Sequence, residues 1–395
     1  MYLQIECDDL HTTVRIRGFK PTIGVAEFHA MIEMYDVYAN VEKQYQKLEE
    51  TVQRLYRHST LKGSTLVWKH FFVSDAINQS PYLTTSFGEV VSVVQQPPLN
   101  GSKANVWLYF VENAQIIRES DDVSIMKRPN YNHIFATQMH ERGIDNSNSS
   151  CQSPLMPIPL SIEHQTNRIF DRYIQNLNRH DCSLERNCIR TWIFVQNIDV
   201  QYSGMVTARR KHFEREGLTP NTHFIASTGI EGRYIYPDVL VLIDAYAIAG
   251  IEPAQIKYLQ APTHLNPTHE YGVTFERGTS VDYGDRRHIY ISGTASINNR
   301  GEIVHPLDVE KQTERTLENV QALLAEAEAE MNDVVSMIVY LRDTADYNVV
   351  NRYMEVNYPT IPRIMILAPV CRPGWLVEVE CIAIKAIDNK QFAEF

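Results

Sequence analysis

Two glutamates near the C-terminal end of the chain alternate with valines, in the order Val377, Glu378, Val379 and Glu380. Successive side chains of a β-strand point to opposite faces of the sheet, so both carboxyl groups are predicted on one face. A partly buried glutamate has a raised pKa and can act as a general acid near neutral pH. The alternative is a solvent-exposed polar face, as on many antiparallel sheets. The pattern does not say which glutamate is the acid.

Arginines at two places in the sequence could bind an anionic substrate. Arg363 follows Pro362 at the start of a predicted strand, where its guanidinium could hold a carboxylate with two parallel hydrogen bonds. The alternative is a surface arginine whose aliphatic stem lies on apolar neighbours. Tyr202 and Arg209 are seven residues apart, which places them on one face of a helix. The alternative for that segment is an exposed basic helix.

Other kinds of site are not predicted. The six cysteines are Cys7, Cys151, Cys182, Cys188, Cys371 and Cys381. Their spacing fits neither a metal site nor a dense disulfide framework, and it indicates reduced thiols in a cytoplasmic protein. Because no glycine-rich phosphate loop and no dinucleotide fingerprint occurs, we expect no cofactor and no metal. The first ten residues are acidic rather than basic and apolar, so a secretory signal is not expected.

The formal net charge of −11 disfavours nucleic acid as a partner, because nucleic-acid binding requires clustered basic residues. No apolar run approaches the roughly 20 residues that a membrane-spanning helix needs. A few arginines focused in a cleft can still attract a small anion. We therefore expect an anionic small-molecule partner, with no nucleic acid and no membrane.

A helix followed by a β-rich segment occurs three times, which predicts three domains of similar fold. The predicted pairs are 41–56 with 66–73, a helix containing Gln165 and Thr166 with 191–195, and 307–330 with 337–341. Gln165 and Thr166 match Gln312 and Thr313 in the third copy. The predicted domains are 1–120, 121–262 and 263–395, and a polar stretch over 145–154 is a predicted surface loop.

A family resemblance appears in the third copy, in the segments Ile291–Ser296, Gln312–Leu324, Val339–Asp343, Pro362–Arg363 and Leu376–Ile384. In this order and spacing they resemble the Rid (YjgF-like) family. The resemblance implies an α+β fold like that of trimeric chorismate mutase. Three tandem copies would then form an intramolecular pseudo-trimer, with ligand clefts between neighbouring copies. The chain is accordingly expected to be a monomer.

A narrower resemblance extends from the second copy into the third, through Trp192, Asn197, Tyr202, Arg209, 227–230, 275–278, 293–296 and 371–375. These segments resemble the chorismatase family, which implies release of pyruvate from chorismate without a cofactor. By this resemblance Glu378 is the general acid, and Arg363, Tyr202 and Arg209 bind the substrate. Gly278 and Cys371 then favour 3-hydroxybenzoate over a dihydroxycyclohexadiene carboxylate. Their alternatives are a turn glycine and a small buried apolar residue.

Aligning the copies places Leu242 of the second and Leu108 of the first opposite Glu378, and Ser227 opposite Arg363. We therefore expect one working site, between the second and third copies. Two other functions remain open: Rid-type hydrolysis of imines or enamines, and ligand binding without catalysis.

Overall fold

The computed structural model of the protein describes residues 1–22, 24–83, 88–143 and 160–395. The predicted surface loop over 145–154, and Cys151 within it, lie outside these residues. Among the described helices, none combines the length and the apolar character needed to cross a membrane.

Three six-stranded mixed sheets share one topology. The first runs in the order β1 (Tyr2–Cys7), β2 (Thr12–Phe19), β3 (Glu27–Met34), β6 (Ala104–Glu112), β4 (Ser64–Val73) and β5 (Val90–Gln95). The second runs β7 (Gln115–Arg118), β8 (Val123–Lys127), β9 (Asn132–Met139), β12 (Val241–Ala249), β10 (Cys188–Val195) and β11 (Ala226–Glu231). The third runs β13 (Ile256–Leu259), β14 (Gly278–Asp282), β15 (Arg286–Ala295), β18 (Val377–Ala386), β16 (Val334–Leu341) and β17 (Arg363–Leu367). In each sheet only the last two strands are parallel, so the predicted threefold repeat is confirmed.

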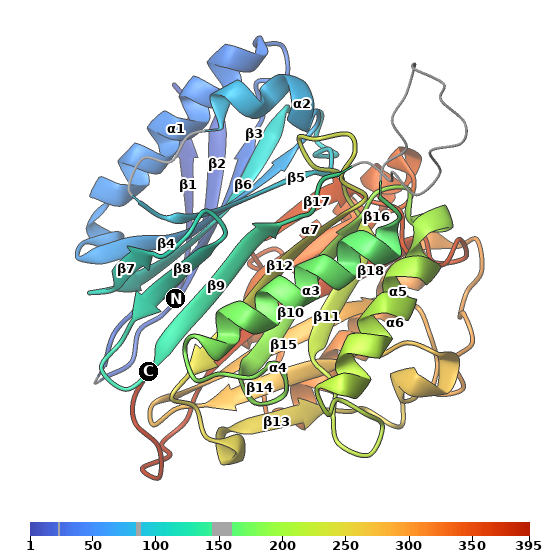
Figure 1. The fold of residues 1–395 in the computed structure, drawn as a ribbon. Helices are drawn as coiled ribbons and strands as arrows, with labels where there is room; N and C mark the ends of the chain where they lie inside the picture. Colours follow the sequence, from blue (N-terminus) through green and yellow to red (C-terminus); the bar gives the residue numbers. More distant parts are fainter. Residues whose placement is uncertain (23, 84–87, 144–159) are drawn as a thin grey trace.

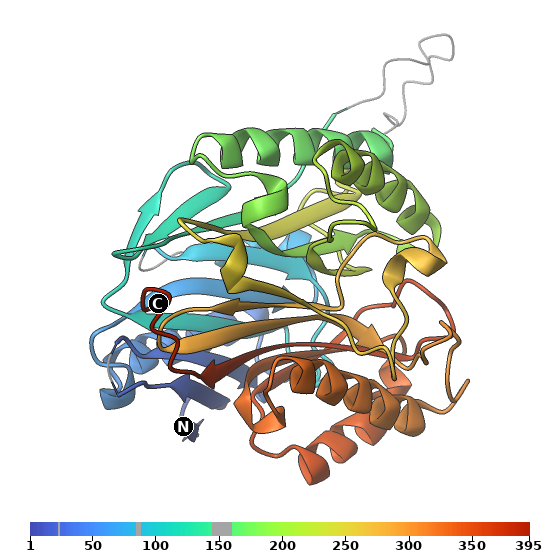
Figure 2. The same cartoon turned by 90° about the horizontal axis from the view of Figure 1, so that it is seen from below.

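Helices cover the outer face of each sheet, and the inner faces meet at the centre of the molecule (Figures 1 and 2). The α-helices are α1 (Val41–Arg57), α2 (Ala76–Gln79), α3 (Ile162–Asn178), α4 (Leu184–Asn187), α5 (Ile198–Arg215), α6 (Val309–Glu326) and α7 (Tyr347–Asn357). The short 3-10 helices are η1 (Ser59–Leu61), η2 (Ser80–Tyr82), η3 (Pro253–Gln255), η4 (Thr268–Tyr271), η5 (Met331–Asp333) and η6 (Thr344–Asp346). The predicted helices thus form, and α5 is longer than α2 and α7, which follow the equivalent strands in the other two domains.

The sheets also locate the domain limits. Strand β7 belongs to the second sheet and β13 belongs to the third. The three domains therefore divide between β6 and β7 and between β12 and β13, a few residues before the predicted limits at 120 and 262.

One buried glutamine repeats in all three domains and ties the first turn of the main helix to the sheet. Gln165 accepts a hydrogen bond from the amide of Leu240 at 2.8 Å, and Gln312 accepts one from Leu376 at 2.9 Å. Gln44 accepts the same bond from Lys103 at 2.8 Å. The predicted match between the second and third copies therefore extends to the first copy. Because a buried backbone amide must be paired, each glutamine secures the start of a central strand.

The three sheets close into a ring because one edge strand of each sheet lies against the next domain. Strand β5 lies against β9, β11 lies against β15, and β17 lies against β3. The parallel edge strand of one domain therefore always faces the central strands of another. This order decides which residues can meet in each cleft.

Strand pairing defines the equivalent positions in the three domains. Glu378 pairs with Tyr340, Leu242 pairs with Phe194, and Asn105 pairs with Phe72, each at the same register from the strand end. Leu242 is thus opposite Glu378, as predicted, but the first-domain counterpart is Asn105 and not Leu108. A β-bulge between Leu66 and Trp68 lies in this ladder. Two of the three clefts still lack the acid.

Candidate functional site

A pocket of about 530 Å³ lies between the second and third domains. Helix α5 supplies Tyr202 and Arg209 to one wall, and β18 supplies Glu378. The loop after β17 supplies Cys371. The other lining residues are Ser227, Gly229, Val273, Phe275, Arg277, Gly293, Ala295, Ile297 and Trp375. Four residues predicted from sequence are therefore brought together from two domains.

Glu378 is held in a setting that favours its protonated form. Its side chain is buried, with the residue only 5% exposed. Burial, and then repulsion from Glu380, raise the pKa of Glu378 to about 8, against the opposing pull of Arg190 and Arg277. Within the described chain, no hydrogen bond to the Glu378 carboxyl group is found. Glu378 is therefore largely protonated at neutral pH and can donate a proton into the pocket.

Glu380 lies on the same face of β18, but it pairs with residues of the second domain. Its Oε2 accepts a hydrogen bond from Nη2 of Arg190 at 2.8 Å, and its Oε1 accepts one from Nε1 of Trp192 at 2.7 Å. Arg190 and Trp192 belong to β10, so this buried ion pair joins the second and third domains. The two glutamates that sequence could not distinguish are therefore separated by their partners, and Glu378 is the one that lines the pocket.

Glycine at position 293 makes room for the acid. A Cβ at Gly293 would collide with Oε1 of Glu378 and lie 3.1 Å from Cγ2 of Thr228. The amide of Gly293 donates to Oγ1 of Thr228 at 2.9 Å, which fixes this turn of β15 against the second domain. The site thus requires a residue without a side chain at this point.

Arg209 is a buried cation that faces the pocket, and the residue is 1% exposed. Burial lowers the pKa of Arg209, and the nearby Tyr202 and Cys371 oppose this shift. In the part of the chain that the structure describes, the Nε and Nη2 atoms of Arg209 have no hydrogen-bond partner, and no carboxylate is among the main groups that shift its pKa. A buried guanidinium without a counter-ion is costly, so this arrangement favours an anionic ligand.

Arg277 supplies a second cation that the sequence predictions did not assign. It is buried, lines the same pocket, and donates to the backbone oxygen of Asn266 at 3.0 Å. Arg277 was part of the quoted 275–278 segment, as Trp375 was of the 371–375 segment. Membership of those segments was therefore the available signal for both residues.

Arg363 does not line this pocket, which corrects the prediction that it shares a substrate with Glu378. It is 2% exposed, pairs with Glu355 and donates to the backbone oxygen of Tyr358 at 3.0 Å. The reason is the order of the ring: β17 faces the first domain, whereas β11 faces Glu378. Position 363 is equivalent to Ser227 on β11, as predicted, and Ser227 is the residue that lines the pocket.

The two proposed product determinants lie differently. Cys371 lines the pocket, and burial raises the pKa of its thiol to about 12, so it is a neutral, compact wall residue. Gly278 is one residue from Arg277 but lies in β14, paired with Leu259 and Ile291. A Cβ there would approach the backbone oxygen of Tyr290 to 3.1 Å. Gly278 therefore acts on the pocket only through its neighbour.

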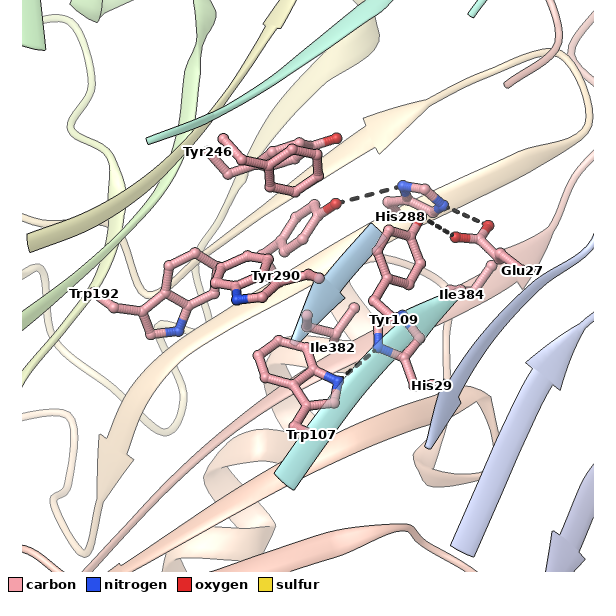
Figure 3. Close-up of a pocket in the computed structure, with 12 residues that line it drawn as sticks. Glu27, His29, Trp107, Tyr109, Trp192, Tyr246, His288, Tyr290, Ile382 and Ile384 are labelled. Carbon is pink, nitrogen blue, oxygen red and sulfur yellow. Dashed lines mark hydrogen bonds and ion pairs between the residues drawn. The ribbon is translucent and has the colours of Figure 1, made fainter. Parts of the chain in front are cut away.

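A second cavity, of about 400 Å³, lies where the inner faces of the three sheets meet (Figure 3). Nε2 of His288 lies 2.8 Å from Oε1 of Glu27, and Nε1 of Trp107 lies 3.0 Å from Nδ1 of His29. Figure 3 marks both contacts. Oε1 of Glu27 also accepts from Nη1 of Arg286 at 2.5 Å. Burial alone would raise the pKa of Glu27, but His288 and Arg286 lower it. The charged groups of this chamber are mutually paired, as expected of a structural core.

Known proteins resemble both the third domain and the whole fold. Residues 280–385 match the family described as Endoribonuclease L-PSP. A RutC family protein of Pyrococcus abyssi is 38% identical over 100 residues, which are 25% of this chain and 78% of the relative. The 3-aminoacrylate deaminase RutC of Acinetobacter baylyi is 28% identical over 97 residues, or 24% of this chain and 77% of the relative. A chorismatase crystal structure has a TM-score of 0.62, covering 81% of this chain and 93% of that chain at 18% identity. This last match extends the likeness in fold to the three-domain arrangement.

Proposed function

Because the chain belongs to the RutC family through its C-terminal domain and has the three-domain fold of a chorismatase, we propose that it cleaves the enol ether of chorismate and releases pyruvate. Glu378 is the general acid. Arg209, Tyr202 and Arg277 bind the substrate, and no cofactor takes part.

One observation carries the proposal: a buried carboxyl group and a buried guanidinium that has no carboxylate partner among the described residues line the same pocket, and burial raises the pKa of the carboxyl group to about 8. An acid of this kind is suited to protonating carbon, and the guanidinium is suited to a substrate carboxylate. Chorismate has two carboxylates and one enol ether. With Glu378 neutral, Arg209 and Arg277 give the pocket a positive charge that matches a dianion.

The reaction begins with transfer of the Glu378 proton to the methylene carbon of the enolpyruvyl group. The carbon bound to the ether oxygen becomes oxocarbenium-like and is stabilised by the Glu378 carboxylate that has just formed. Water or a ring hydroxyl adds to this centre and returns a proton to Glu378. The bond between that carbon and the ether oxygen then breaks and the ether oxygen takes up a proton; where water was the nucleophile, pyruvate leaves at this step. Where the ring hydroxyl was the nucleophile, the bond between its oxygen and the ring carbon also breaks and the ring loses a proton, so pyruvate leaves with that oxygen and the ring becomes aromatic. Apolar walls such as Phe275 and Trp375 limit the access of bulk water.

We further propose 3-hydroxybenzoate as the aromatic product. The support is Cys371, whose small side chain leaves room beside the substrate ring. Formation of 3-hydroxybenzoate and pyruvate consumes no water overall, whereas a dihydroxycyclohexadiene carboxylate contains one added water. The masses of the products therefore distinguish the two routes.

The test is a lactate dehydrogenase-coupled pyruvate assay on chorismate, with chromatography of the ring product. The wild-type protein is expected to release pyruvate, and Arg209→Ala is expected to raise KM by about 10-fold or more, because a charged hydrogen bond is lost. Arg215→Ala, on the same helix but exposed and paired with Asp171, should behave as wild type. If the wild-type protein releases no pyruvate, the proposal fails.

A second candidate is hydrolysis of an enamine or imine derived from an amino acid. It is favoured by the relative named 3-aminoacrylate deaminase. The chemistry is related, because an enamine carbon is protonated as an enol ether carbon is. Ammonia release from 2-aminoacrylate that is unchanged in Arg209→Ala, together with no pyruvate from chorismate, would favour this candidate.

A further inference from the structure

Arg342 follows the last residue of β16 and reaches from the third domain to the second. Its Nη2 lies 2.6 Å from Oδ1 and 2.6 Å from Oδ2 of Asp199, in the first turn of α5. Its Nη1 donates to the backbone oxygen of Val370 at 2.8 Å. One guanidinium therefore holds both the start of α5 and the loop that carries Cys371. Arg342 itself is not among the residues that line the pocket.

The two segments that Arg342 joins both line the pocket and lie beside each other, since Tyr202 and Arg209 of α5 are close enough to Cys371 to influence its pKa or to be influenced by it. Helix α5 carries Tyr202 and Arg209, and the loop carries Cys371 and Trp375. A further set of bonds fixes the same corner. The carboxylate of Glu231 accepts from the amides of Asn197 at 3.0 Å and Ile198 at 2.6 Å, and the amide of Glu231 donates to the Pro369 oxygen at 3.1 Å. These bonds anchor α5 and the loop to the end of β11.

The threefold repeat provides an internal comparison. The residue after the equivalent strand is Gln196 in the second domain and Ser74 in the first. Neither side chain can form a two-pronged ion pair with a carboxylate. The arginine therefore occurs only in the domain that also carries Glu378, and it spans the cleft in which Glu378 lies.

We infer that Arg342 is a positioning residue for the reaction proposed above, on which this inference rests. It sets the separation between the substrate-binding helix and the Cys371 loop. Glu378 is held in β18 by pairing with Tyr340 and Ala295, whereas the Arg342 side chain contacts Asp199 and Val370. Loss of Arg342 should therefore weaken substrate binding much more than it slows proton transfer.

The test compares Arg342→Gln with Arg142→Gln in the full-length protein. Arg142 is a matched control, because it also forms a two-pronged ion pair, with Asp238 at 3.1 and 3.0 Å, but within the second domain and away from this pocket. Amide hydrogen exchange followed by mass spectrometry is measured first, without substrate. We expect at least threefold faster exchange in 198–203 and 369–375 for Arg342→Gln, and no change for Arg142→Gln.

Kinetics on chorismate then provide a readout that general destabilisation would not reproduce. Arg342→Gln should raise KM at least fivefold and change kcat less than twofold. The fall in activity as Glu378 loses its proton, at a pH of about 8, should stay unchanged. Arg342→Lys should have a KM between those of the wild-type protein and Arg342→Gln, because lysine keeps the charge but cannot form two parallel hydrogen bonds. Asp199→Asn should raise KM as well, and combining it with Arg342→Gln should add little.

The two ideas fail in different ways. If the wild-type protein releases no pyruvate, the proposed function is wrong. The amide exchange measurement then still tests whether Arg342 holds the start of α5 and the Cys371 loop in place. If the wild-type protein is active but Arg342→Gln has the same KM and the same amide exchange rates, the positioning role of Arg342 is overturned. A lower kcat together with a lower unfolding temperature, without a change in KM, would also overturn the positioning role of Arg342.

Discussion

Glu378 combines three local influences that no neighbour in the sequence could supply alone. Burial removes the water that would stabilise its charge, and Glu380 disfavours a second negative charge nearby. Arg190 is the main opposing cation, but its Nη2 donates to Glu380. The balance leaves Glu378 as an acid, while Glu380 serves as an ion-pair partner two residues away.

Replacement of Glu378 by glutamine tests this assignment. The wild-type kcat/KM is expected to fall as the pH rises through about 8, because the proton donor is lost. Glu378→Gln should reduce kcat by about 100-fold or more and abolish this descending limb, since an amide cannot act as the acid. Pyruvate release measured from pH 5 to about pH 10 checks both. Retention of the limb in the variant would assign the titration to another group.

Stability should change with pH in a linked way. The pKa of Glu378 is raised in the folded state, so the folded protein binds more protons than the unfolded chain above the unfolded pKa of about 4.3. Its contribution is fully present below that value and is lost as the pH rises through about 8. As the pH rises from about 4.3 to about 8, the free energy of unfolding should therefore decline less for Glu378→Gln than for the wild-type protein, by at most about 1.4 kcal/mol per pH unit.

At the level of elements, β15 and β18 form a matched pair in which the absent side chain of Gly293 leaves the space that Glu378 occupies. The second-domain strand β9 has Gln138 at the equivalent place, where the neighbouring strand has Leu242 in place of the glutamate. The acid and the glycine therefore occur together, in one of three otherwise similar sheets.

Gly293→Ala is expected to disable the site while preserving the fold. The added methyl group must displace the Glu378 carboxyl or the Thr228 methyl, so kcat should fall by about 10-fold or more. The control is the same change in a Glu378→Ala background, where room already exists. Thermal unfolding of all four proteins should show that Gly293→Ala costs less stability there. An equal cost in both backgrounds would mean that Glu378 is not what Gly293 accommodates.

On the scale of the whole molecule, the three junctions of the ring are joined by buried polar contacts. Glu27 pairs with Arg286 between the first and third domains, and Glu380 pairs with Arg190 between the second and third. Between the first and second domains, the buried Asp244 of β12 accepts a hydrogen bond from the hydroxyl group of Ser92 in β5. One chain therefore closes a ring of three domains.

The closed ring predicts a monomer in solution. One edge strand of each sheet already lies against a neighbouring domain; these strands are β5, β11 and β17. These three edges are therefore not open to further chains. Light scattering should give a mass near 45.5 kDa that is independent of protein concentration. A mass of two or three chains would show that surfaces outside the ring associate.

The sequence alone determined the elements and their repetition, because these depend on local periodicity. Helices α1, α3 and α6 and strands β4, β10 and β16 lie where the apolar patterns indicated. The alternation around Glu378 also sufficed to place both glutamates on one face of a strand. Spacing on one helix face placed Tyr202 and Arg209 together on α5, and they line the same pocket.

Only the tertiary structure decided that Arg363 lies apart from this site and that Ser227 takes a place in its wall. Arg363 and Glu378 belong to one domain, yet the ring turns β17 toward the first domain and brings Ser227 and Arg209 of the second to Glu378. Partners from β10 separated Glu378 from Glu380. Local pattern fixes the direction of a side chain within its own element, whereas the identity of its neighbour across a cleft depends on how whole sheets pack.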